Sequence, residues 1–155
     1  MREPLKVLFV CSGNCSLARM AEALGSAVGR GLLKCRGMGT SSDDIHPLAV
    51  RAMAEVGIDI SQRASPVREQ CMDERFDLVI TLCERGRAVA LTQVTWSDRI
   101  RWTFVDPSEG RGTEDEQLRA FRRVRDELRQ RIQLFLLANR ITARVSPPLR
   151  LVRAV

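Results

Sequence analysis

The sequence predicts an α/β fold in which a four-stranded, doubly wound parallel sheet is flanked by helices. Residues 5–10 form a nearly continuous apolar and β-branched run, which is typical of a strand buried on both faces of a parallel sheet. Segments of strand and helix period alternate after this run, and such alternation predicts parallel βαβ units. The length of 155 residues, of which 45% are apolar, fits one globular domain.

The first half of the chain is expected to supply two strands and two helices. After the first strand, apolar residues recur at helical spacing over residues 18–28, and Gly29 ends that pattern. Residues 32–35 predict a second, short strand. Residues 47–56 predict a helix that begins with a proline and closes before Gly57.

The second half predicts two more strands and a long helix. The segment FDLVITL at residues 76–82 is a strong strand pattern, and residues 100–105 form another. Residues 113–137 carry an amphipathic helical stripe that opens with a threonine and acidic residues. We therefore expect a domain over residues 1–139 and a C-terminal tail over residues 140–155, where two adjacent prolines prevent a helix from continuing.

Composition narrows the function classes. No apolar run approaches the roughly 20 residues that a membrane-spanning helix needs, and the first run is too short for a signal peptide. Five Cys at irregular spacings with one His fit neither a disulfide framework nor a zinc site. We expect reduced thiols in the cytoplasm, with no metal, no cofactor and no membrane partner.

The net charge of +6 originates in the C-terminal region. Residues 117–155 carry ten Arg against two acidic residues. Aromatic residues do not interleave these arginines in the way that binding of single-stranded nucleic acid would favour. We interpret the region as a solvated basic face, with nucleic-acid binding as the less favoured alternative.

The loop after the first strand has the features of a reactive site. Cys11 stands at the carboxyl end of the buried strand and just before a helix, where doubly wound sheets bind ligands. Backbone N–H groups and the helix dipole favour an oxyanion there and lower the pKa of a thiol. Gly13 and Asn14 permit the tight turn that folds a loop around an anion. Cys11 is therefore a candidate thiolate nucleophile, and the alternative is a small buried residue at a strand end.

Several motifs resemble one family over about residues 5–138. They are VLFVCSGN with MAEAL behind it, HPLAVRAMAEVGIDIS at 46–61, FDLVITLC at 76–83, Trp102 with Asp106-Pro107, and FRRVRDELRQRI at 121–132. The sequence resembles the low-molecular-weight tyrosine phosphatases and, within that fold, the thiol-dependent arsenate reductases. The resemblance implies that Cys11 attacks an oxyanion and that Asp106 is the general acid, which agrees with the extended geometry that Pro107 imposes on Asp106.

The resemblance also implies an oxyanion-binding loop, from which this chain departs twice. The loop residues are Ser12, Gly13, Asn14, Cys15, Ser16, Leu17, Ala18 and Arg19. Leu17 stands where the family has an Arg and Ala18 where it usually has Ser, so both changes remove polar ligands. Losing one such donor typically lowers the rate about 10²-fold or more. Arg19 lies two residues further on and is expected to leave on another helix face, unless its side chain folds back over the anion.

A redox role is implied by the same resemblance. Arsenate reductases of this type pass a disulfide from the nucleophile to a second and then a third Cys, which thioredoxin reduces. Cys83 matches the second Cys, whereas Ala90 stands where the third would be, so the relay is incomplete. Cys15 is an alternative partner for Cys11, if the short loop permits disulfide geometry.

Three other residues are expected to be structural. Cys35 and Cys71 fit buried packing positions. His46 precedes a proline at a helix start, and as a lone His it is expected to cap or pack rather than to catalyse.

The resemblance also bears on a cation. Asn14 and Glu22 match positions from which some arsenate reductases bind potassium. Gly37 stands where the accompanying Ser would be, which weakens that inference. The other interpretation of Glu22 is that it favours the helix start.

These observations predict an enzyme that uses the Cys11 thiolate against arsenate or a phosphate ester, with activity impaired by the loss of the loop Arg. The alternative is a non-catalytic relative that binds oxyanions or senses redox state, with Cys11 and Cys83 as the switch. An interaction module that uses the basic last helix explains no feature of the loop. The expected ligand is a small oxyanion (arsenate, phosphate or phosphotyrosine), and the expected protein partner is thioredoxin.

Overall fold

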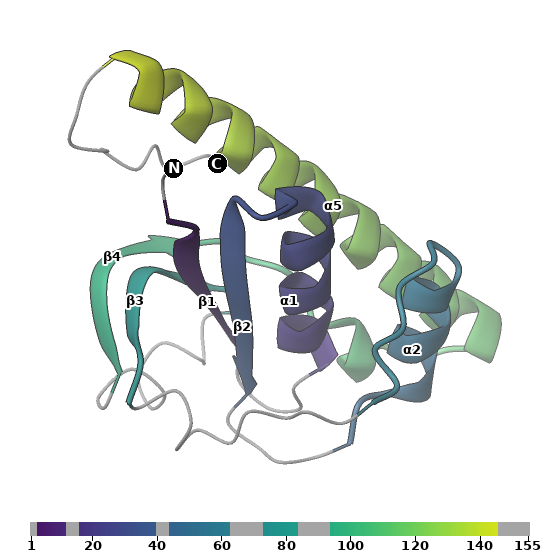
Figure 1. Cartoon of the computed structure of the whole chain (residues 1–155). Helices are drawn as coiled ribbons and strands as arrows, with labels where there is room; N and C mark the ends of the chain where they lie inside the picture. The colour runs from purple at the N-terminus through teal and green to yellow at the C-terminus, as the bar shows by residue number, and fades with distance from the viewer. Residues whose placement is uncertain (1–2, 12–15, 40–43, 63–72, 84–93, 146–155) are drawn as a thin grey trace.

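The computed structural model describes residues 3–11, 16–39, 44–62, 73–83 and 94–145, with side chains up to residue 139. Figure 1 shows the strands side by side, with the helices α1, α2 and α5 on one side of them. The elements are β1 (Leu5–Cys11), α1 (Ser16–Gly29), β2 (Leu33–Gly39), α2 (Pro47–Ala54), β3 (Arg75–Thr81), β4 (Thr95–Arg101), the short 3₁₀ helix η1 (Pro107–Glu109) and α5 (Glu114–Val145).

The strands form one parallel sheet in the order β2-β1-β3-β4. The chain moves outward from β1 to β2 and then returns past β1 to β3 and β4. The predicted four-stranded, doubly wound parallel sheet is therefore confirmed. In such sheets the direction of winding reverses between two neighbouring strands, here β1 and β3, and ligands bind beyond the carboxyl ends of that pair.

Strand β1 lies in the centre of the sheet because its sequence suits burial on both faces. The residues from Val7 to Cys11 are at most 1% exposed. Val7 and Phe9 belong to the core shared with α1, α2 and α5. Leu8 and Val10 point to the opposite face, where they pack with apolar residues of β2 and β3.

Helix α1 covers the sheet with the apolar stripe that its sequence predicts. Met20, Ala21 and Leu24 are fully buried against the core. The helix ends at Gly29, and the chain turns back towards β2 through Arg30 and Gly31, which both have positive φ. The long helix α5 packs on α1 and α2 (Figure 1). Within the described residues, no helix combines the length and the apolar character that spanning a bilayer requires.

Two strands differ from their predicted bounds. Strand β4 was expected at residues 100–105 but spans Thr95–Arg101. As an edge strand it tolerates a polar, partly exposed sequence, whereas the apolar residues Trp102 and Phe104 that suggested the later position are buried just after it. Strand β2 runs on to Gly39 because it pairs with β1 in register along its whole length, despite two glycines.

Helix α5 continues through Val145, beyond its predicted end at residue 137. The residues from 138 to 145 contain neither Gly nor Pro, so nothing in the backbone stops the helix before Pro147. The helix was expected to end at residue 137 because the apolar stripe is weak beyond that point, but a weak stripe does not by itself end a helix. The division between a domain over residues 1–139 and a tail remains a prediction.

Candidate functional site

The carboxyl ends of β1 and β3 bring two cysteines together. Cys11 is the last residue of β1 and is fully buried. The backbone ladder continues past the end of β3, because the Leu82 N–H donates to the Val10 carbonyl over 2.8 Å. This bond carries the following residue, Cys83, alongside the end of β1. The Sγ atoms of Cys11 and Cys83 are 3.5 Å apart, within the range of a thiol hydrogen bond.

This pair is suited to two-electron chemistry. Both cysteines carry reduced thiols that are not in a disulfide, and Cys83 is partly exposed. A disulfide has an S–S length of about 2.05 Å, so the two sulfur atoms need to approach by roughly 1.5 Å to form a bond. The expected alternative partner, Cys15, lies outside the described residues, as do Cys71 and Ala90.

Cys35 differs sharply from this pair. It lies within β2 and is 7% exposed. Burial, helped by the negative charge of Glu22, raises the pKa of the Cys35 thiol to about 12. Its thiolate is therefore scarce at neutral pH, which agrees with the structural role expected for it.

Asp106 is also held at the carboxyl edge of the sheet. The Phe104 N–H donates to the Leu82 carbonyl over 3.0 Å, which brings the segment after β4 to this edge. Asp106 is extended, as expected before Pro107, and caps η1. Its Oδ1 accepts hydrogen bonds from the backbone N–H and the hydroxyl of Ser108, at 2.9 and 2.6 Å. The orientation of the carboxyl group is thus fixed through Oδ1, while Oδ2 is the oxygen that could exchange a proton.

The predicted oxyanion loop is described in part. Ser12, Gly13, Asn14 and Cys15 lie outside the described residues. Ser16, Leu17 and Ala18 form the first turn of α1, with at most 1% exposure each. The Leu17 and Ala18 side chains belong to the hydrophobic core, so their contribution to an anion would come from backbone N–H groups at the helix start.

Arg19 is committed to a neighbouring carboxylate. Its Nη1 lies 2.7 Å from Oε2 of Glu22, and the two side chains are 11% and 20% exposed. The same Oε2 accepts the Gly37 N–H over 2.8 Å, which ties α1 to β2. Burial raises the pKa of Glu22, while the Arg19 charge and the Gly37 hydrogen bond act in the opposite direction. Glu22 is therefore a link between helix and sheet, which the helix-start interpretation did not anticipate.

The described residues around Glu22, which do not include Asn14, do not favour a potassium ion. The Arg19 guanidinium already supplies a positive charge on the oxygen that such an ion would use. A side chain at position 37 has no room, because a Cβ there would lie 2.4 Å from the Ala18 carbonyl oxygen. In the described ranges, no group of three or more His, Cys, Asp or Glu side chains could hold a metal.

Two links at the helix start were missed from the sequence. The His46 N–H donates to the Ser16 hydroxyl over 2.8 Å, which joins the start of α1 to the start of α2. The His46 ring caps α2 by accepting the Leu48 N–H at Nδ1 and packs on Phe121, as expected for a structural His. The Arg19–Glu22 pair could have been found from its i,i+3 spacing, whereas the contact of Ser16 with His46 joins distant parts of the chain and leaves no such signal.

Comparison with known proteins agrees with this architecture. Residues 6–146 match the family model for low molecular weight phosphotyrosine protein phosphatase. An arsenate reductase of Halalkalibacterium halodurans is 36% identical over 129 residues, which are 83% of this chain and 93% of the relative. The structure of an arsenate reductase in the phosphate binding state is 33% identical, with a TM-score of 0.68 over 86% of this chain and 98% of that one.

A low molecular weight protein tyrosine phosphatase from Bacillus subtilis shares the fold at 23% identity, with a TM-score of 0.69 over 90% of this chain and 99% of that one. Its similarity therefore concerns the arrangement of strands and helices. The arsenate reductases, in contrast, match in sequence as well as in fold. The chain thus belongs to the low molecular weight phosphotyrosine protein phosphatase family, and over most of its length it is similar to the arsenate reductases.

Proposed function

We propose that this chain reduces arsenate, with Cys11 as nucleophile and Cys83 as the thiol that resolves the intermediate. The observation that carries the proposal is the 3.5 Å separation of their Sγ atoms. Hydrolysis of a phosphate ester needs one nucleophilic thiol, and a second thiol beside it has no part in that reaction. Reduction of arsenate requires two electrons, which a pair of adjacent thiols supplies when it becomes a disulfide.

The proposed reaction balances with this pair alone. The Cys11 thiolate attacks arsenic and an oxygen leaves as water, with one proton donated by Asp106. The Cys83 thiolate then attacks Sγ of Cys11. The S–S bond forms, the S–As bond breaks, and its electron pair stays on arsenic, which leaves as arsenite. Two thiols and one arsenate thus give one disulfide, one arsenite and one water.

The missing loop Arg is expected to make this reaction slow. Arg19 does not substitute for it, because its guanidinium lies on Glu22 at 2.7 Å. The remaining attraction for the oxyanion comes from backbone N–H groups and from the N-terminal end of α1. We therefore expect weak binding of arsenate and phosphate, with a rate about 10²-fold or more below that of a site with the Arg.

Regeneration requires an external reductant, and thioredoxin is the proposed one. Since Ala90 removes the third Cys of the relay, thioredoxin would have to reach the Cys11–Cys83 disulfide directly, and reduction is expected to be slow. A reducing compartment is needed for this step, so the proposed location is the cytoplasm.

A single-turnover experiment tests the proposal. The fully reduced protein, freed of small thiols, is mixed with arsenate, arsenite is quantified, and disulfides are mapped by mass spectrometry. We expect about one arsenite per chain and a Cys11–Cys83 bridge. Cys11→Ser should abolish both arsenite formation and hydrolysis of p-nitrophenyl phosphate, whereas Cys83→Ser should abolish arsenite formation and spare hydrolysis.

The matched control is Cys35→Ser, which removes a thiol outside the pair and should leave arsenite formation unchanged. A Cys11–Cys15 bridge, or undiminished arsenite from Cys83→Ser, would show that Cys83 is not the resolving thiol. Hydrolysis of p-nitrophenyl phosphate without any arsenite would assign the chain to phosphoester chemistry instead.

A further inference from the structure

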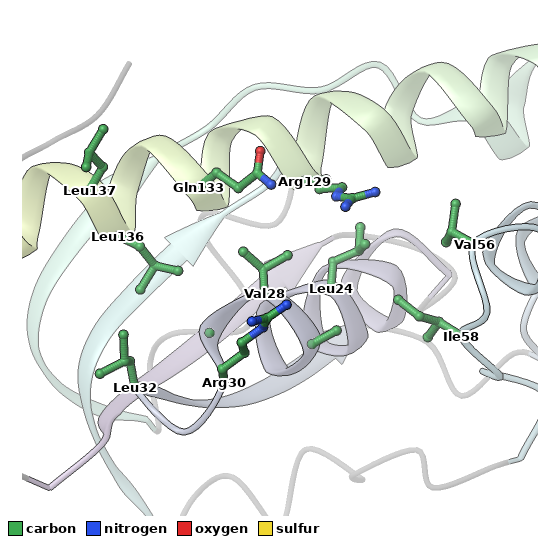
Figure 2. A pocket seen from close by; sticks show the side chains of 12 residues that line it. Leu24, Val28, Arg30, Leu32, Val56, Ile58, Arg129, Gln133, Leu136 and Leu137 are labelled. Carbon is green, nitrogen blue, oxygen red and sulfur yellow. The ribbon is translucent and has the colours of Figure 1, made fainter.

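A groove of about 590 Å³ lies far from the paired cysteines, between the C-terminal half of α1 and the middle of α5. Figure 2 shows Arg129, Gln133 and Leu136 of α5 facing Leu24 and Val28 of α1 across it. Helix α1 begins at the reactive end of the sheet, and its first residue that lines the groove, Leu24, lies about 12 Å further along the helix axis. Its volume lies within the range of about 300–1,000 Å³ that is typical of small-molecule sites.

About half of the wall of the groove is apolar, and the groove is open to solvent. Leu32 and Leu137, at one end, are 42% and 58% exposed, and Val56 at the other end is 37% exposed. Exposed apolar side chains that line one groove mark a binding surface more often than scattered ones do. The groove is elongated and has apolar residues at both ends, so it suits a linear apolar chain.

Two arginines give the groove a positive charge. Arg30 and Arg129 both line it, and no acidic side chain does so among the described residues. Neither arginine forms an ion pair within the described part of the chain. Both side chains are exposed, so an anion that enters the groove can replace their hydration and meets no competing carboxylate from the described lining.

The backbone at Arg30 adds a second observation. Arg30 has φ of +43°, in the left-handed region that favours glycine. Gly31 beside it also has positive φ, so the turn could be built from glycines without strain. Arg30 fills the left-handed position that commonly ends a helix, so the turn itself does not require an arginine there.

We propose that this groove binds an amphipathic carboxylate with a linear acyl chain. The acyl chain lies along the apolar wall between Leu32 and Val56, and the carboxylate pairs with Arg30 and Arg129. Arginine is well suited to this task, because its planar guanidinium binds carboxylates in a bidentate manner. The site is distinct from the proposed arsenate chemistry and does not depend on it.

Charge argues against two other occupants. The C-terminal residues 146–155 contain two Arg and no acidic residue, so they would bring like charge to the groove. A second copy of the chain, packed groove to groove, would face Arg30 and Arg129 with their own counterparts, on chains that each carry +6. An anionic apolar ligand meets both the charge and the apolar surface.

Isothermal titration calorimetry with dodecanoate, kept below its micelle concentration, tests the proposal. We expect one ligand per chain, and binding that tightens by up to about fourfold for each methylene from octanoate to dodecanoate. Dodecyltrimethylammonium, which has the same chain and the opposite charge, should not bind. Arg30→Gln and Arg129→Gln should each weaken dodecanoate binding at least threefold.

Arg123→Gln is the matched control, since it makes the same change at an exposed position of α5 outside the groove, and should leave binding unchanged. Cys11→Ser should bind dodecanoate as the wild type does, which separates this site from the thiol pair. Absence of binding, several ligands per chain, equal binding of the cationic detergent, or no effect of either groove arginine would overturn the proposal. A dimer in sedimentation that dodecanoate dissociates would assign the groove to a second copy instead.

Discussion

The two ends of α1 use arginine in opposite ways. At the N-terminal end, Arg19 is 11% exposed and lies 2.7 Å from Glu22, which also accepts the Gly37 N–H. At the C-terminal end, Arg30 is exposed in a left-handed turn and, together with Arg129, lines a partly apolar groove that has no acidic side chain in the described part of the chain. One arginine completes an internal contact, and the other two face outward.

The difference teaches that solvent access decides what an arginine can do. A buried guanidinium must be paired, because an isolated charge inside a protein is very costly. Arg19 is therefore part of the scaffold and cannot turn towards an oxyanion without leaving Glu22 uncompensated. Exposed arginines keep their hydration and can exchange it for a ligand. Substitutions at the N-terminal end should accordingly change the stability of the fold, whereas substitutions at the C-terminal end should change ligand binding.

The largest change in stability is expected from Gly37→Ala, because α1 approaches β2 closely at this residue. The added Cβ would lie 2.4 Å from the Ala18 carbonyl oxygen and 3.1 Å from Oε2 of Glu22. Because one neighbour is backbone, the strand or the helix must shift, and we expect a loss of about 3 kcal/mol in the free energy of unfolding. Urea denaturation measures it. Ala27→Ser, at an exposed position of the same helix, should cost less than about 0.5 kcal/mol.

Arg19→Met should lower the free energy of unfolding by about 2 kcal/mol at pH 7, because it removes the guanidinium that pairs directly with the Glu22 carboxylate and leaves only the charge of Arg36. This value is below that of a fully buried pair, since both side chains retain some contact with water. The double variant Arg19→Met with Glu22→Gln should recover part of the loss. If Arg19→Met proved as harmless as Arg30→Gln, the contrast between the two ends would fail.

The cost of Arg19→Met should also depend on pH. Burial raises the pKa of Glu22 above its ordinary value of 4.5, so the folded state binds this proton more tightly than the unfolded chain does. The stability that Glu22 contributes is then greatest below pH 4.5 and falls as the pH rises through the folded pKa. Removing the Arg19 charge raises that pKa further. The deficit of the variant relative to wild type should therefore shrink between pH 7 and about pH 5 in matched denaturation curves.

Ser16→Ala should have a smaller effect at the same end. It removes the hydroxyl that accepts the His46 N–H, and leaving this partly buried donor without its acceptor costs about 1 kcal/mol. Thermal denaturation would detect this loss. Hydrogen exchange should locate it, with faster exchange at the start of α2 and unchanged rates in β1; uniform acceleration across the chain would argue against a local link.

The smallest effect, of opposite sign, is expected from Arg30→Gly. Glycine adopts the left-handed turn without strain, so the free energy of unfolding should rise by about 0.5–1 kcal/mol. The same variant should bind dodecanoate more weakly. A gain in stability with a loss of binding would sharpen the contrast with Arg19, whereas a loss of stability would show that Arg30 also supports the fold.

The sequence predicted the parallel sheet because the apolar run of β1 and the alternation of periods are local properties of the chain. It also placed Cys11 and Cys83 directly after predicted strands, and the carboxyl ends of parallel strands share one edge of a sheet. It did not predict their distance, which depends on the ladder bond from Leu82 to Val10 across the sheet.

Other features were beyond prediction for a similar physical reason. The apolar pair Trp102 and Phe104 resembled a strand, but these residues fill the core just after β4, whose own sequence is polar because it lies at the sheet edge. The Gly37 hydrogen bond to Glu22 and the groove beside α5 both arise from packing between distant segments. The spacing of apolar residues along one helix or strand carries no information about contacts between distant segments.

The position of β1 has a consequence for which sulfur atom moves. This strand is bonded to β2 along seven residues and to β3 along four, so its amides should be among the last to exchange with deuterated water. Cys11 is anchored at the end of this persistent segment. Cys83 lies two residues past the end of β3 and is partly exposed, whereas Cys11 is fully buried. The roughly 1.5 Å of travel needed for an S–S bond should therefore come from Cys83, with the central strand acting as the fixed reference.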